Sequence, residues 1–161
     1  WISFTANYLT VNPLRMLCLL TVKRKTNVKK PKYILDSYAL LAYFQGEPAG
    51  AKVRTILKEA SNGHAVIFMS VISLGEIYYI VARKKGKENA VEITEDISSL
   101  PVDLIDITTK RVLAAAHVKS QYPVSYADAF VVAAAQEFSA TIVTGDPEFK
   151  ETESIAAVYW L

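Results

Sequence analysis

The sequence has 161 residues, of which 52% are hydrophobic and 21% are charged, with a formal net charge of +2. This length and composition are typical of one globular domain and exclude a disordered or collagen-like chain. No apolar run approaches the roughly 18 residues that a membrane-spanning helix needs, and the single cysteine, Cys18, allows no internal disulfide. We therefore expect a cytoplasmic protein with no membrane anchor.

The charged residues are unevenly distributed along the chain. Residues 1–32 hold seven of the 18 lysines and arginines and no acidic residue. This segment shows no helical or strand period, so we expect a basic, poorly ordered N-terminal extension followed by one domain over residues 33–161. That domain holds the other 11 basic residues and all 16 acidic ones. It therefore has no overall basic field, and any RNA binding must rely on local patches and bound metal ions.

From residue 33 onward the sequence alternates between strand-like and helix-like segments. In chain order we expect a strand at 33–36, helices at 37–45 and 48–60, a strand at 64–69, helices at 70–83 and 87–100, a strand at 102–107, helices at 108–121 and 125–139, a strand at 141–144 and a short strand at 157–161. This alternation predicts a three-layer α/β/α fold, with a central parallel sheet of four to five strands covered on both faces.

Four acidic residues fall near the carboxyl ends of the expected strands. Asp36 ends the first strand, Asp146 follows the fourth, Glu76 follows the second by about one helical turn, and Asp128 lies in the first turn of the Ala-rich helix. Open α/β sheets bind ligands at this edge. Crowded carboxylates repel one another, and a divalent cation relieves that repulsion. An all-oxygen donor set without cysteine or histidine favours Mg²⁺ or Mn²⁺ over zinc.

Each acid also has a purely structural interpretation. Residues 73–76 and 125–128 both fit the capping-box pattern, and Asp146-Pro147 fits a helix N-cap followed by proline. Asp36 could cap the helix that follows it. For any single acid, capping is the simpler interpretation, whereas four acids on one rim favour a metal site.

From Tyr33 to Leu161 the sequence resembles PIN-domain nucleases, and most closely the VapC-type toxins of toxin–antitoxin pairs. The motifs that carry the resemblance are Tyr33-Ile34-Leu35-Asp36-Ser37, Ser70-Val71-Ile72-Ser73-Leu74-Gly75-Glu76-Ile77, Ser125-Tyr126-Ala127-Asp128-Ala129 and Thr144-Gly145-Asp146. The resemblance implies a PIN-like fold with a catalytic metal site of Asp36, Glu76, Asp128 and Asp146. It further implies that the hydroxyls of Ser37 and Thr144 orient carboxylates or a metal-bound water, although both could be ordinary cap or strand-end hydroxyls.

The activity that the resemblance implies is metal-dependent endoribonuclease cleavage by the toxin of a toxin–antitoxin pair. A small antitoxin protein and a second copy of the chain, forming a homodimer, would be its partners. The alternative is a non-catalytic PIN-like module that binds RNA or protein. A receiver or aspartyl-phosphatase domain is disfavoured, because position 38 is tyrosine where a second acid is needed and no Gly-rich phosphate loop is present. The RNA target, the choice of metal and the number of ions stay open.

Other residues near these motifs have two interpretations each. A basic cluster of Arg83, Lys84, Lys85 and Lys87 could hold RNA phosphates, or could simply favour a helix C-terminus. Three tyrosines near the acids, Tyr78, Tyr79 and Tyr126, could stack bases or be ordinary aromatics of the core or its rim. Glu148 is close enough to Asp146 in sequence to contact a metal through water, although we expect it to be solvated.

Overall fold

The computed structural model describes residues 29–161, so the expectation of a poorly ordered extension concerns residues that lie almost entirely outside the described part. Within it, the strands are β1 (Lys32–Leu35), β2 (Val66–Ser70), β3 (Asp103–Ile105), β4 (Thr141–Thr144) and β5 (Val158–Trp160). The helices are α2 (Ser37–Phe44), α3 (Gly50–Ser61), α4 (Val71–Lys85), α5 (Lys87–Ser98), α6 (Thr109–Gln121), α7 (Tyr126–Phe138) and the 3-10 helix η1 (Pro147–Thr152). No helix in residues 29–161 is both long and apolar enough to cross a membrane.

The strands form one parallel sheet in the order β3-β2-β1-β4-β5. The chain moves outward from β1 to β2 and β3 on one side, then returns to place β4 and β5 on the other. The direction of winding therefore reverses between β1 and β4, which is where open α/β sheets bind their ligands. The predicted α/β class and parallel sheet are confirmed, with five strands.

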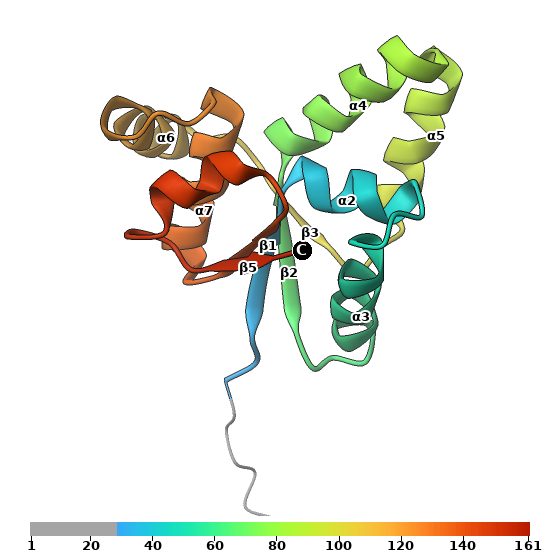
Figure 1. Cartoon of the computed structure of the whole chain (residues 1–161), viewed down its shortest axis with the longest axis horizontal. Helices are drawn as coiled ribbons and strands as arrows, with labels where there is room; N and C mark the ends of the chain where they lie inside the picture. Colours follow the sequence, from blue (N-terminus) through green and yellow to red (C-terminus); the bar gives the residue numbers. More distant parts are fainter. Residues whose placement is uncertain (1–28) are drawn as a thin grey trace, which may run out of the picture.

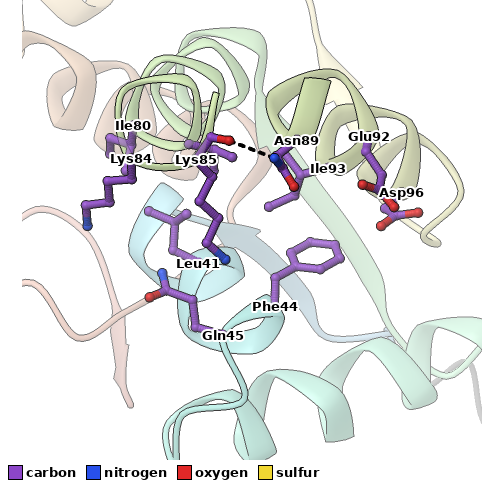
Figure 2. A pocket seen from close by; sticks show the side chains of 11 residues that line it. Leu41, Phe44, Gln45, Ile80, Lys84, Lys85, Asn89, Glu92, Ile93 and Asp96 are labelled. Carbon is purple, nitrogen blue, oxygen red and sulfur yellow. Dashed lines mark hydrogen bonds between the residues drawn. The ribbon is translucent and has the colours of Figure 1, made fainter. Parts of the chain in front are cut away.

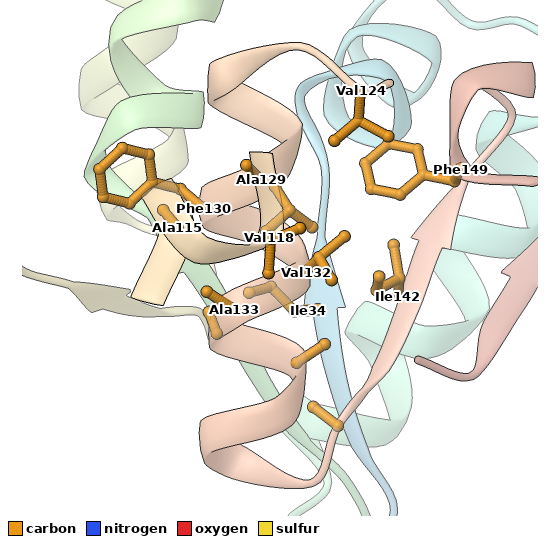
Figure 3. Packing of buried hydrophobic residues seen from close by; sticks show 14 of the residues in the cluster. Ile34, Ala115, Val118, Val124, Ala129, Phe130, Val132, Ala133, Ile142 and Phe149 are labelled. Carbon is orange, nitrogen blue, oxygen red and sulfur yellow. The ribbon is translucent and has the colours of Figure 1, made fainter. Parts of the chain in front are cut away.

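Helices cover both faces of the sheet, as Figure 1 shows, with α6 and α7 on one face and α2 to α5 on the other. Alternate side chains of β1 serve the two cores, because Ile34 packs on the α7 face and Leu35 on the opposite face. Figure 3 shows Ile34 and Ile142 of the sheet beside Val118 and Val132 of the covering helices. The predicted burial of the Ala-rich helix is confirmed, since eight of the 13 residues of α7 are buried.

Several predicted boundaries were wrong by a few residues. Helix α3 begins at Gly50, not Pro48, because residues 47–50 form a turn in which the Gly50 amide donates to the Glu47 carbonyl at 2.9 Å. A β-carbon at position 50 would lie 2.6 Å from the Ala42 carbonyl oxygen, so only glycine lets α3 pass this close to α2. The second strand begins at Val66, because the His64 amide still donates to the Glu59 carbonyl of α3.

Candidate metal centre

The register of β1 and β4 sets the centre of the candidate site. Leu35 pairs with Val143, and the Asp36 amide donates to the Val143 carbonyl at 3.3 Å. Asp36 and Thr144, the next residues along β1 and β4, are therefore neighbours at the carboxyl edge of the sheet. The Thr144 hydroxyl Oγ1 donates to Asp36 Oδ2 at 3.0 Å. Sequence reasoning gave Thr144 this orienting role only through a family resemblance, and the strand register now supplies the physical reason for its contact with Asp36.

Asp36 is the most deeply buried of the four acids, with 2% of its surface exposed. Its Oδ1 accepts from the Ser37 amide at 2.6 Å, and its Oδ2 accepts from Thr144. Burial raises the pKa of Asp36 to about 6; the hydrogen bonds from Thr144 and Ser37 oppose this shift, and the charge of Glu76 adds to it. Asp36 is thus held in a fixed orientation at a considerable electrostatic cost.

Glu76 is attached to this centre by a serine hydroxyl. Ser37 Oγ donates to Glu76 Oε2 at 2.8 Å and lies 3.4 Å from Asp36 Oδ1. On the other side of the carboxylate, the Tyr79 hydroxyl donates to Glu76 Oε1 at 3.4 Å. Ser37, the first residue of α2, therefore links Asp36 at the start of α2 to Glu76 of α4.

Asp128 enters from α7, on the other face of the sheet. Ser125 caps this helix, since its Oγ accepts from the Asp128 amide at 3.1 Å. Asp128 is 6% exposed. Burial raises the pKa of Asp128 to about 7. A side-chain hydrogen bond with Ser125 opposes the shift, while the charge of Asp36, a side-chain hydrogen bond with Glu148 and the charge of Asp146 reinforce it. Asp128 therefore lies within electrostatic range of both strand-end acids.

Asp146 caps η1, because its Oδ1 accepts from the Glu148 amide at 2.9 Å. The Asp146 amide donates back to Thr144 Oγ1 at 3.0 Å, so one threonine hydroxyl contacts both strand-end acids. The helix η1 was not predicted as an element, although Asp146-Pro147 carried its capping signal. Glu148 is exposed as expected, yet its Oε2 also accepts from the Ser125 amide at 3.0 Å, which sequence reasoning missed.

The capping interpretation of residues 73–76 was wrong. The N-cap of α4 is Ser70, whose Oγ accepts from the Ile72 amide at 3.2 Å, because the helix starts immediately after β2 without a loop. Ser73 is fully buried inside the helix, and its hydroxyl has no hydrogen-bond partner among residues 29–161. The caps expected at Asp36, Ser125 and Asp146 are confirmed. Asp36 and Asp146 are therefore both helix caps and part of the acidic cluster, so the two interpretations do not exclude each other.

The donor chemistry of this cluster fits a hydrated divalent cation. Within residues 29–161 the one ion pair is Arg111–Glu137, so the four acids have no cationic partner in that part of the chain. No group of three carboxylate, histidine or cysteine side chains in the same part is arranged as a finished metal cage. Mg²⁺ commonly binds through one or two carboxylates and keeps several waters. The cluster supports such an ion, and the individual ligands stay a prediction.

The predicted basic cluster lies away from the acids. Arg83, Lys84 and Lys85 occupy the last turn of α4, about 10 to 14 Å further along the helix than Glu76 at 1.5 Å per residue. Figure 2 shows Lys84 and Lys85 beside a groove of about 290 Å³ between α2, α4 and α5, with Leu41, Phe44 and Ile93 on its apolar side. This position agrees with a helix C-terminus favouring cations, and the RNA-binding role stays a prediction.

The tyrosines near the acids differ in exposure. Tyr78 is half-buried and packs against the α2–α5 core, whereas Tyr79 and Tyr126 are 48% and 47% exposed. A further tyrosine, Tyr38, is 38% exposed and packs against Gly145, the residue before Asp146. Its place two residues after Asp36, in the first turn of a helix, was the sequence signal that could have singled it out.

The fold and the acidic cluster agree with comparisons to known proteins. Residues 33–155 match the family model of the PIN domain, and the chain belongs to this family. Solved structures share its fold. A chain from the DNA-bound VapBC2 complex of Rickettsia felis matches at 20% identity with a TM-score of 0.63, covering 81% of this chain and 98% of that one.

Two further structures are similar to the same extent. A chain of DNA-bound VapBC from Salmonella typhimurium matches at 17% identity with a TM-score of 0.62, covering 80% of this chain and 97% of that one. VapC20 of Mycobacterium tuberculosis, described as a sarcin–ricin loop cleaving toxin, matches at 17% identity with a TM-score of 0.60, covering 74% and 94%. Comparison with curated protein sequences gives no match.

Proposed function

We propose that this PIN-domain protein is a divalent-metal-dependent endoribonuclease and acts as the toxin of a toxin–antitoxin pair. One observation carries the proposal: Asp36 and Asp128 are buried carboxylates with raised pKa values at the switch point of the sheet, without a cationic partner in residues 29–161. Burying such groups is unfavourable unless a charge of opposite sign joins them. A divalent cation provides that charge.

A bound Mg²⁺ or Mn²⁺ would activate a water molecule and stabilise charge on the phosphodiester during cleavage. Asp36, Asp128 and Asp146 are the main candidate ligands. Thr144 and the Ser37 amide fix the orientation of the Asp36 carboxylate, and the Ser37 hydroxyl turns one oxygen of Glu76 toward the same centre. Glu76 is then placed either to bind the ion or to orient the attacking water.

RNA is supported as the substrate by the relatives. VapC20, which shares the fold, is described as cleaving the sarcin–ricin loop. Several similar chains come from structures of VapBC or FitAB, and one is described as a toxin–antitoxin complex, which supports a small antitoxin as partner and action in the cytoplasm. A homodimer follows from the same family resemblance. The competing function, a non-catalytic binding module, leaves the uncompensated burial of Asp36 and Asp128 without a purpose.

The test is cleavage of a mixture of structured RNAs in Mn²⁺, Mg²⁺ or EDTA. Wild type is compared with Asp36→Asn and with Asp103→Asn, which removes an exposed carboxylate at the amino end of β3, away from the acidic edge. We expect metal-dependent cleavage by wild type and Asp103→Asn, and none by Asp36→Asn. If the folded, metal-loaded wild type cleaves neither this mixture nor total cellular RNA, the non-catalytic binding module is favoured.

A further inference from the structure

Two exposed tyrosines border the acidic cluster on the side of α2 and α4. Tyr38 follows Asp36 by two residues and is 38% exposed, and Tyr79 lies one turn beyond Glu76 and is 48% exposed. The Tyr79 hydroxyl donates to the Glu76 carboxylate at 3.4 Å. Both rings are therefore next to acid-bearing segments while part of their surface stays open to solvent.

Tyr38 is fixed by its contact with the turn after β4. A β-carbon at position 145 would collide with Cε1 of the Tyr38 ring and would lie 2.7 Å from its Cζ. Gly145 therefore lets the ring rest on the backbone directly before Asp146. The position of this aromatic surface is coupled to the position of the strand-end acid.

The charges of the domain limit how RNA can be held. Residues 33–161 carry 16 acidic and 11 basic residues, and the basic cluster at the end of α4 is separated from Glu76 by two to three turns. Phosphate contacts, which usually dominate affinity for nucleic acid, then depend on a few basic side chains such as Arg83, which is within electrostatic range of Tyr79. Stacking of bases on aromatic rings supplies affinity without cationic side chains.

We propose that Tyr38 and Tyr79 form a binding site for unpaired nucleobases that flank the phosphate at the acidic cluster; this rests on the proposed ribonuclease function. Only unstacked bases can lie on these rings, so the site takes single-stranded or looped RNA and not an intact duplex. It determines which part of an RNA is presented to Asp36.

The test measures how tightly the protein binds a short, fluorescently labelled unpaired RNA and the same sequence as a duplex. All variants also carry Asp36→Asn, which prevents cleavage, and the buffer contains Mg²⁺. We compare Tyr38→Leu, Tyr79→Leu and both phenylalanine variants. Tyr159→Leu is the matched control, because Tyr159 is 42% exposed on β5 and contacts Lys52 instead of an acid. Each leucine variant at 38 or 79 should bind about fivefold to 100-fold more weakly, and each phenylalanine variant almost normally.

Because stacking is not ionic, the loss should be equal at low and high salt. Unchanged affinity of both leucine variants, an equal loss in Tyr159→Leu, or preference for the duplex would overturn the proposal. If the leucine variants bind RNA normally but lose binding to a copurified protein partner, the surface is a protein interface and the proposal is wrong. Since binding is measured without cleavage, failure of the nuclease assay would leave this result interpretable.

A different observation concerns the start of α7. In a complete capping box, the acid three residues after the cap accepts from the amide of the capping residue. Here Ser125 Oγ accepts from the Asp128 amide as in such a box, but the Ser125 amide donates at 3.0 Å to Oε2 of Glu148, in the short helix η1 that follows β4. Glu148 thus accepts the hydrogen bond from the Ser125 amide that Asp128 would accept in a complete capping box.

Apolar packing accompanies this hydrogen bond. Val124 and Phe149, the neighbours of Ser125 and Glu148, are 1% and 0% exposed and belong to one core cluster, which Figure 3 shows. The Glu148 amide also donates to Asp146 Oδ1 at 2.9 Å. The turn after β4 is therefore held against the start of α7 by polar contacts of Glu148 and by apolar packing of Phe149.

We infer that Glu148 is a positioning residue: it relieves Asp128 of capping and holds α7 against the end of β4, which places Asp128 and Asp146 where both would bind one divalent ion. This also rests on the proposed metal-dependent function. Glu148→Gln keeps an acceptor for the Ser125 amide, whereas Glu148→Ala removes it. Glu151→Ala, an exposed acid in the same short helix, is the control.

The readouts are Mn²⁺ affinity by titration calorimetry and amide hydrogen exchange at residues 125–128. Glu148→Ala should weaken Mn²⁺ binding about 10-fold to 100-fold and speed this exchange, as for other residues that orient metal ligands. Glu148→Gln should stay within about threefold of wild type. Normal affinity in Glu148→Ala, or a defect in Glu148→Gln as large as in Glu148→Ala, would overturn the inference. If wild type binds no Mn²⁺, the proposed function is wrong. If amide exchange at residues 125–128 is unchanged in Glu148→Ala, Glu148 does not hold the start of α7 in place.

Discussion

Replacing Asp36 by asparagine should stabilise the metal-free protein at neutral pH while abolishing cleavage. The folded state raises the pKa of Asp36 from 3.8 to about 6. The native protein therefore binds this proton more tightly than the unfolded chain does. The favourable contribution is fully present below about pH 4 and is lost as pH rises through about 6. A shift of this size corresponds to about 3 kcal/mol at 1.36 kcal/mol per unit.

The neutral asparagine side chain avoids the cost of burying a charged carboxylate, but it forms fewer hydrogen bonds with the neighbouring donors. The Asp36 carboxylate accepts from the Ser37 amide and from Thr144 Oγ1, and an asparagine side chain offers one acceptor where the carboxylate offers two. Losing one such hydrogen bond costs on the order of 1 kcal/mol. We therefore expect Asp36→Asn to unfold with a free energy about 1 to 2 kcal/mol higher than wild type at pH 7.5 in EDTA.

Urea unfolding in EDTA at pH 4.5 and pH 7.5 measures this difference. The advantage of the variant should shrink or reverse at the lower pH, where wild-type Asp36 is protonated. Adding Mg²⁺ at pH 7.5 should stabilise wild type, by about 2.7 kcal/mol at 100 times the dissociation constant, and should leave the variant nearly unchanged. A variant clearly less stable than wild type at pH 7.5 without metal would refute the reasoning, because Asp36 would then be stabilising as a bare carboxylate.

Three further outcomes are expected from the same contacts. Because the pKa of Asp128 is raised to about 7, cleavage at low, subsaturating Mg²⁺ should rise as pH increases from about 5.5 to 8, and a pH–rate profile that is flat over this range would contradict it. Thr144→Val removes both hydrogen bonds of Oγ1, to Asp36 and from Asp146, and should lower cleavage about 10-fold to 100-fold. Thr94→Val, which removes only a hydrogen bond to the Val91 carbonyl within α5, should not. Gly145→Ala displaces the Tyr38 ring and should weaken binding of unpaired RNA as Tyr38→Leu does; in a double-mutant cycle the two effects should not add.

The fold could be predicted from sequence because its signals are local. Alternating strand and helix patterns predicted the strands and α-helices of residues 29–161, and three of the expected caps are formed by the residues that carried the signal. The errors came where neighbouring elements decide a boundary. Gly50 starts its helix where close approach to Ala42 requires it, and Ser70 leaves a strand directly into a helix, so the cap lies three residues before the expected one.

The acids of the candidate site could be named from sequence, but their supporting contacts could not. Asp36 and Asp146 follow strands, which places them on one edge by topology alone. The Glu148–Ser125 hydrogen bond and the Tyr38–Gly145 contact join residues 23 and 107 positions apart. Such contacts depend on the strand order and register, which no local pattern specifies.

The starts of three helices help three of the acids to lie close together before any ion arrives. Asp36 caps α2, Asp146 caps η1, and Asp128 lies in the first turn of α7. Backbone N–H groups at helix starts carry partial positive charge and stabilise anions. Glu76 differs, because it lies in the second turn of α4 and has hydroxyls from Ser37 and Tyr79 in place of backbone amides. Its carboxylate is therefore held by side-chain hydroxyls, and Ser37→Ala should free it while leaving Asp36, Asp128 and Asp146 in place.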